Sequence, residues 1–189
     1  MPEVKLKGVN FRGTLGALER LAGKDTVART LAATGGPAGE ALRVGEVVAG
    51  GWYPASWYAA LLEAIETTTG KGPEFIRECS REAIRADFAT IFKVISLFIS
   101  PERALDNATR VMARYYDGGK LSVQEAREGF IRFRFDEYVG LDHRMWEDIA
   151  GGMEGVLISM RVLEPRAQIV GGGRDGDAHM VVELVWRPK

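Results

Sequence analysis

Apolar and polar residues follow two different periods in the C-terminal part of the chain. Along "GFIRFRF", apolar side chains alternate with two arginines, and this period of two predicts a strand with one solvated face. A strand over about 120–125 would pair with it as a hairpin. Helical spacing returns over 141–160, and two closing strands are expected over about 161–170 and 178–187, joined by the turn "GGGRDGD".

The N-terminal part follows helical spacing instead. A short strand in "EVKLKGVNF" precedes a helix with leucines on one side and a second helix over about 25–33, for which Asp25 is the expected N-cap. The glycine-rich segment 34–51 is expected to be irregular and the loosest part of this half. Pro54 is expected to open a further helix that Gly70 ends.

A long helix over about 73–99 and another after Ser100 and Pro101 complete the predicted helical half. The resulting order is a short strand, helices, and then β-β-α-β-β. It predicts an α+β fold in which a helical layer, about 11–117, packs on one face of a small antiparallel sheet formed by about 118–189. A length of 189 residues predicts a single domain.

Composition excludes several classes of function and of site. The net charge is −1, so there is no basic field to hold nucleic acid or an anionic membrane. The longest apolar stretch, "IFKVISLFI", is too short to span a bilayer. The single cysteine, Cys79, excludes an internal disulfide framework and a multi-cysteine zinc site, and the start of the chain has no apolar segment. We therefore expect a cytoplasmic protein.

Catalytic and metal-binding patterns are not found. The two histidines, His143 and His179, have no nucleophile or carboxylate at a recognised spacing. The carboxylates of "GLDHRMWED" are expected near the start of a helix because of its macrodipole. The glycines of "GGGRDGD" lie between two strands, so a hairpin turn is expected there rather than a phosphate loop. We predict that the protein is not an enzyme and has no metal site.

Aromatic residues concentrate in "GGWYPASWY", which contains Trp52, Tyr53, Trp57 and Tyr58. Three interpretations stay open: core packing, the lining of an apolar pocket, and a face for a partner protein. Gly151 and Gly152 stand inside a helical stripe, where glycine costs stability. Either the helix breaks there or another segment packs very close to it.

Several short motifs, "WYPASWY", "SPERAL", "YYDGG", "GGMEGVL" and "VVELVWRPK", resemble a myxobacterial paralogous family that carries a domain-of-unknown-function label. The layout is more remotely similar to the superfamily of 4-vinyl reductase-like sensor domains, haem nitric-oxide-binding domains and Bet3-type TRAPP subunits. That resemblance implies a helical layer that covers a small antiparallel sheet and encloses an apolar pocket, with a glycine pair beside it.

This sequence lacks residues that are typical of the haem-binding domains and of the 4-vinyl reductase-like sensors. The haem-binding members need a proximal histidine and a Tyr-Ser-Arg-type propionate clamp; the clamp is absent, and His143 is expected to be a polar residue of a first helical turn. The cysteine that 4-vinyl reductase-like sensors often carry is absent from "WEDIAGGMEG". In Bet3-type subunits a helix cysteine can carry an acyl chain, but a buried hydrophobe is the expected role of Cys79.

Two functions follow. The first is a non-enzymatic regulatory or adaptor domain without a cofactor that binds a partner protein and forms a homodimer. The alternative is a sensor domain that binds a small hydrophobic molecule in a pocket between the helices and the sheet. The residues predicted to bind the ligand or partner are Trp52, Tyr53, Trp57, Tyr58, Phe88, Phe92, Trp146, Gly151 and Gly152.

Overall fold

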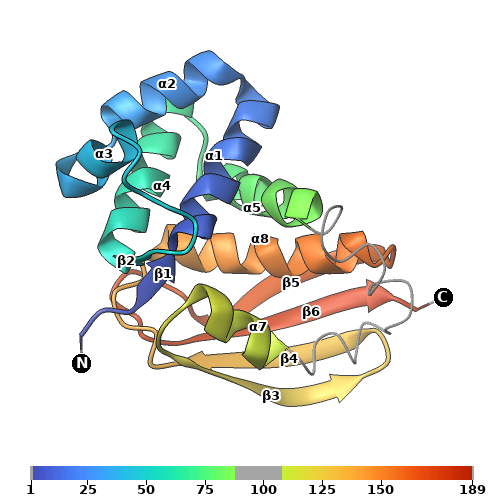
Figure 1. Ribbon diagram of the computed structural model, residues 1–189. Helices are drawn as coiled ribbons and strands as arrows, with labels where there is room; N and C mark the ends of the chain where they lie inside the picture. Colours follow the sequence, from blue (N-terminus) through green and yellow to red (C-terminus); the bar gives the residue numbers. More distant parts are fainter. Residues whose placement is uncertain (1, 88–107, 189) are drawn as a thin grey trace.

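The fold was analysed in a computed structural model, which describes residues 2–87 and 108–188. The elements in chain order are β1 (Lys5–Lys7), α1 (Gly8–Ala22), α2 (Lys24–Ala33), α3 (Gly36–Arg43), β2 (Trp52–Pro54), α4 (Ala55–Thr69), α5 (Pro73–Asp87), α7 (Ala108–Tyr115), β3 (Lys120–Arg127), β4 (Phe130–Asp136), α8 (His143–Ser159), β5 (Leu163–Gly172) and β6 (Met180–Arg187). The predicted α+β fold, with a helical N-terminal half and a C-terminal β-β-α-β-β unit, is confirmed (Figure 1).

The larger sheet is antiparallel, with the strand order β3-β4-β6-β5. Its two central strands show the predicted alternation. Phe133 and Phe135 of β4 are fully buried, whereas Arg132 lies on the opposite face and donates a hydrogen bond to Glu183 of β6 (2.9 Å). The period of two therefore identified the covered face correctly, because only one face of this sheet packs against the helical layer.

Helix α8 occupies the centre of the molecule. It lies between the sheet and α5, and it also contacts α4 (Figure 1). Asp142 caps its N-terminus by accepting a hydrogen bond from the Met145 N–H (3.0 Å). Met145, Ile149 and Leu157 are buried. Because α8 touches both layers, its side chains are the ones best placed to form a site between them.

The N-terminal strand connects the two parts of the fold. Leu6 of β1 pairs with Tyr53 of β2 and forms an isolated antiparallel bridge to Tyr116, just after α7. The Val4 N–H donates to the Val139 carbonyl in the segment before α8 (2.9 Å). The three residues of β1 therefore join the helical layer to the chain that leads into the sheet and α8.

Some local predictions were wrong. Gly23, not Asp25, occupies the N-cap of α2, and no side chain caps that helix. Segment 34–51, expected to be irregular, contains the helix α3. Pro54 is the last residue of β2 and the N-cap of α4, which begins at Ala55, so the predicted start of that helix is correct to within one residue. The end of α4 at Gly70 is confirmed: this residue has φ 64°, a left-handed conformation that glycine adopts without strain.

The remaining helix predictions reach beyond the part of the chain that the structure describes. The predicted long helix is observed as α5 up to Asp87, and positions 88–99, with the candidates Phe88 and Phe92, lie outside the described residues. The predicted cap at Ser100 lies outside them too. Across residues 2–87 and 108–188, the structure contains no helix with the length and apolarity needed to cross a membrane.

Candidate functional site

Helix α8 passes α5 at very short range. It runs unbroken through Gly151 and Gly152, so the second of the two sequence interpretations is correct. A Cβ atom added at Gly151 would lie 2.3 Å from the Arg77 carbonyl oxygen, and one at Gly155 would lie 3.0 Å from the Arg81 carbonyl oxygen. A side chain at Gly151 has no room, because the obstacle is the α5 backbone itself.

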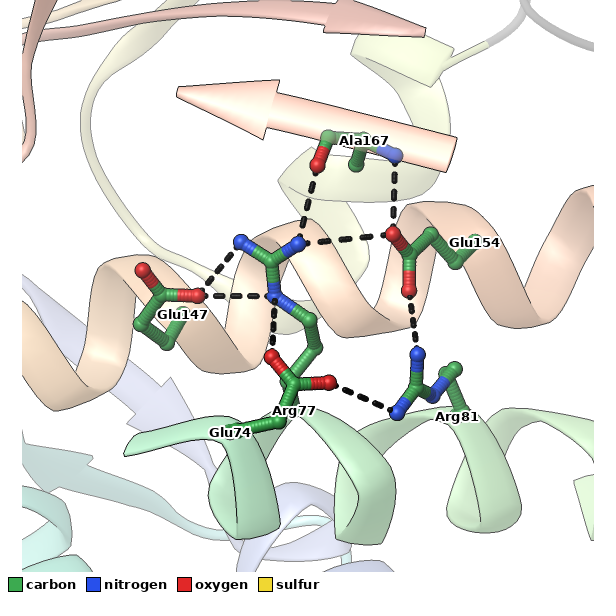
Figure 2. Close-up of polar contacts among 6 residues, drawn as sticks. All are labelled: Glu74, Arg77, Arg81, Glu147, Glu154 and Ala167. Atoms are coloured by element: carbon green, nitrogen blue, oxygen red, sulfur yellow. Dashed lines mark hydrogen bonds and ion pairs between the residues drawn. The ribbon is translucent and has the colours of Figure 1, made fainter. Parts of the chain in front are cut away.

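An ion-pair network fixes this crossing (Figure 2). Arg77 Nε of α5 donates to Glu147 Oε2 (2.7 Å), and Arg77 Nη1 donates to the Ala167 carbonyl of β5 (2.8 Å). Glu154 accepts from Arg81 Nη1 (2.9 Å) and from the Ala167 N–H (2.8 Å), and its side chain is only 5% exposed. Each of the three carboxylates of the network, Glu74, Glu147 and Glu154, contacts at least one of its two guanidiniums. The network therefore stabilises the packing of α5, α8 and β5.

Asp148 differs from its neighbour Glu147, although it lies on the same helix. Its Oδ1 accepts a hydrogen bond from Tyr58 Oη (3.1 Å), which is itself 2.6 Å from Thr14 Oγ1. In the described part of the chain no lysine or arginine forms an ion pair with it. Burial raises the pKa of Asp148 from 3.8 to about 7, although hydrogen bonds from Ser80 and Tyr58 lower it. Asp148 is thus a buried carboxyl group held by hydroxyl groups alone.

The charge of Asp148 acts on other interior groups. Burial, and next the Asp148 charge, raises the pKa of the Cys79 thiol to about 12. The same two causes raise the pKa of Tyr116 well above its usual value. The Cys79 thiol therefore stays protonated at neutral pH and is a poor nucleophile, which agrees with the prediction of a buried hydrophobe.

An aromatic cluster lies between α8 and the sheet. Trp146 meets Phe135 and Tyr138 edge to face, with ring centroids 6.3 and 6.1 Å apart, and Tyr138 meets Tyr116 in the same way (5.6 Å). Trp146 is completely buried, and its Nε1 has no hydrogen-bond partner among the residues that the structure describes.

The structure separates the predicted aromatic residues. Tyr58 and Trp146 are buried in the interior. Tyr53 and Trp57 are half-buried and stack on each other (centroids 5.6 Å apart), and Trp52 is 40% exposed beside Lys7. Phe11 meets both Tyr53 (5.7 Å) and Tyr58 (5.0 Å) edge to face, so three aromatic residues of the stretch belong to one group near α1, and the exposed Trp52 stands apart. Sequence reasoning missed Tyr116, Tyr138 and Phe135, because three separate elements bring them together with Trp146.

Both histidines lie near the turn between β5 and β6. His143 Nδ1 is 2.8 Å from Asp175 Oδ1, the His143 N–H donates to the same oxygen (2.9 Å), and the imidazole is 36% exposed. His179 directly precedes β6 and is half-buried against Gly172. The expected role of His143, a polar residue in a first helical turn, agrees with this position.

Comparisons with solved structures give matches over nearly the full length. One is the Fe(II) unliganded H-NOX protein from K. algicida, with 13% identity, a TM-score of 0.70 and coverage of 97% of this chain and 98% of that one. An oxygen-binding H-NOX domain related to soluble guanylate cyclases, in its oxygen complex, has 18% identity, a TM-score of 0.69 and coverage of 97% and 96%. An H-NOX structure from work on haem distortion has 19% identity, a TM-score of 0.70 and coverage of 97% of both chains.

These matches correct two predictions. A protein-binding adaptor is the wrong interpretation, since the matched domains are named for haem and for oxygen, and the alternative of a ligand-binding sensor is favoured. The expectation of no cofactor is contradicted by the same structural neighbours. No protein-family model matches the sequence, and no curated protein matches it either, so the myxobacterial resemblance is not supported. The chain has the fold of H-NOX domains.

Proposed function

We propose that this protein is a sensor domain that binds a planar hydrophobic molecule in its interior, between the helical layer and the sheet, and catalyses no reaction of its own. The observation that carries the proposal is the shared fold: nearly the whole chain matches H-NOX domains, among them an oxygen-binding domain in its oxygen complex and one studied for haem distortion. The buried aromatic side chains around Trp146 are of the kind that line small-molecule sites, which are mostly apolar and aromatic.

Haem is the molecule that the fold suggests first, and its iron needs an axial ligand. The chain has two histidines, and both are at the β5–β6 turn, with His143 bound to Asp175. The sequence of positions 88–107 contains no histidine, cysteine, methionine or tyrosine. A ligand from the interior would therefore have to be a thiol, a phenol or a thioether from the rest of the chain.

Those groups do not fit the iron. Thiols and phenols ligate as anions, but burial raises the pKa of Cys79 and of Tyr138 to about 12. Methionine is the haem ligand of cytochromes together with a histidine, and neither histidine reaches the interior. The residues present do not fit a haem that is held through its iron. They fit a planar molecule that is held by apolar and aromatic contacts.

The experiment is a titration of the purified protein with protoporphyrin IX and with haem, followed by quenching of tryptophan fluorescence and by native mass spectrometry. We expect saturable binding at one molecule per chain. Protein that binds neither compound, and that also carries no bound mass when it is purified from its source, would contradict the proposed function. A cytoplasmic location and a homodimer stay predictions from the sequence.

A further inference from the structure

The indole N–H of Trp146 is a buried donor without an acceptor. The side chain is 0% exposed, and Nε1 has no partner within residues 2–87 and 108–188. Buried tryptophan N–H groups normally find a partner, because an unsatisfied buried donor loses its hydrogen bonds to water with nothing in return. Such a group therefore requires an explanation.

A second buried group without a partner, Thr30 Oγ1, has a simpler explanation. Its neighbours Thr26 and Thr34 each donate to the carbonyl four residues earlier (2.8 Å in both cases), and a threonine hydroxyl on a helix can rotate to bond its own backbone in the same way. The indole ring of Trp146 has no such option, because its N–H points outward in the plane of a rigid ring.

A trapped water molecule is a poor acceptor at this position. Buried water needs two to four polar partners. Among the described residues, the rings of Phe135 and Tyr138 meet Trp146 edge to face, and these two side chains provide one hydroxyl group between them. A ligand oxygen would satisfy the indole N–H without the further polar partners that a water molecule needs.

We infer that Trp146 Nε1 donates a hydrogen bond to the ligand of the proposed interior site. The ligand class is then a planar hydrophobic molecule that carries a carbonyl or carboxylate oxygen, recognised through this hydrogen bond rather than through a metal ion. The inference rests on the proposed function and adds two statements to it: which atom recognises the ligand, and that iron contributes little to its binding.

The test compares two tryptophan variants with two probes. Protoporphyrin IX and haem share the same carboxylates, but only haem contains iron. Trp146→Phe keeps an aromatic ring and removes the donor, and Trp52→Phe is the matched control at an exposed tryptophan. We expect Trp146→Phe to raise the dissociation constant of both probes roughly 10-fold, and Trp52→Phe to change it less than about twofold. Wild-type protein should bind the two probes within about threefold of each other.

A second measurement does not depend on the folding of the variant. In wild-type protein the indole N–H resonance of Trp146, identified by its absence from Trp146→Phe or by sequential assignment, should move downfield when protoporphyrin IX is added. Binding that leaves this resonance and the Trp146→Phe affinity unchanged overturns the inference and keeps the proposed function. A preference for haem above about 30-fold overturns the statement on iron. Wild-type protein that binds neither probe, and that carries no bound mass when it is purified from its source, overturns the proposed function, and this inference with it.

Discussion

Glu147 and Asp148 are adjacent acidic residues on one helix, but their surroundings differ: Glu147 is paired with an arginine and Asp148 is not. Glu147 lies on the side of α8 that faces Arg77, and together with Glu154 it belongs to a network in which each carboxylate has a guanidinium partner. Asp148 faces Tyr58 and Ser80 and is buried without a counter-charge in the described chain.

The difference separates two kinds of buried polar group. Those of the first kind form ion pairs that fix the packing of helices and strands, and those of the second kind lack a counter-charge or a hydrogen-bond acceptor. A buried ion pair with full hydrogen bonding fixes the arrangement of the elements that carry it, whereas an unpaired buried group costs free energy. Asp148 and the Trp146 N–H belong to the second kind, on two different sides of α8: Asp148 faces Tyr58 and Ser80 of the helical layer, and Trp146 faces Phe135 of the sheet. Three experiments test this contrast.

The largest effect is expected from Arg77→Met. Removal of the guanidinium leaves Glu147 and Glu154 without their shared partner, and the loss of one member of a buried ion pair typically costs 3–5 kcal/mol. We expect the free energy of unfolding, measured with urea, to fall by about 3 kcal/mol, because Arg81 still pairs with Glu154. Arg85→Met is the control: its exposed pair with Glu82 should be worth less than about 1 kcal/mol. Equal losses in the two variants would contradict the structural role of the network.

The next effect is expected from Gly151→Ala. A Cβ atom here collides with the α5 backbone, 2.3 Å from the Arg77 carbonyl oxygen, so the helices must separate. Overpacking of this kind costs about 1–3 kcal/mol, and we expect the upper end of that range in urea unfolding. At Gly152 the nearest atom is Ser80 Oγ, 3.3 Å away. Gly152→Ala should stay within about 1 kcal/mol of wild type, since alanine also favours the helix.

The glycine pair shows which part of the helix packing the sequence could predict and which part it could not. Two glycines in a helical stripe predicted either a break or a close neighbour, but not which segment that neighbour would be. The approach of Arg77 depends on packing between helices about 70 residues apart in the chain. By contrast, the covered face of β4 was predicted correctly, because a period of two over adjacent residues is a local pattern.

The hydroxyl groups around Asp148 could not be predicted in the same way. Thr14, Tyr58, Ser80 and Asp148 come from four helices, and the hydrogen bonds between them span 44 and 90 residues. Nothing in their spacing distinguishes Asp148 from Glu147. The adaptor function was chosen for a related reason: the likeness to H-NOX domains lies in the fold, at 13–19% identity, and not in a local sequence pattern.

The smallest and most specific effect is expected from the titration of Asp148. Its pKa is raised from 3.8 to about 7 by burial, so between these values the folded protein binds a proton that the unfolded chain has lost. The free energy of unfolding therefore falls as the pH rises through this window, and the loss is complete above the folded-state pKa. At 1.36 kcal/mol for each pKa unit, the limit is about 4 kcal/mol; we expect about 2 kcal/mol after local relaxation.

Asp148→Asn removes the titrating group and keeps its size and one carbonyl acceptor for the Tyr58 hydroxyl. The variant should match wild type near pH 5 within about 1 kcal/mol and exceed it by about 2 kcal/mol near pH 8.5, in urea unfolding at both pH values. Asp142→Asn, at the cap of the same helix, serves as the control for an aspartate-to-asparagine change on α8, because asparagine caps as well as aspartate, although this variant also loses the ion pair with Arg144. If Asp148→Asn ran parallel to wild type, a partner for this carboxylate would have to exist, and Asp148 would belong with Glu147 among the paired groups.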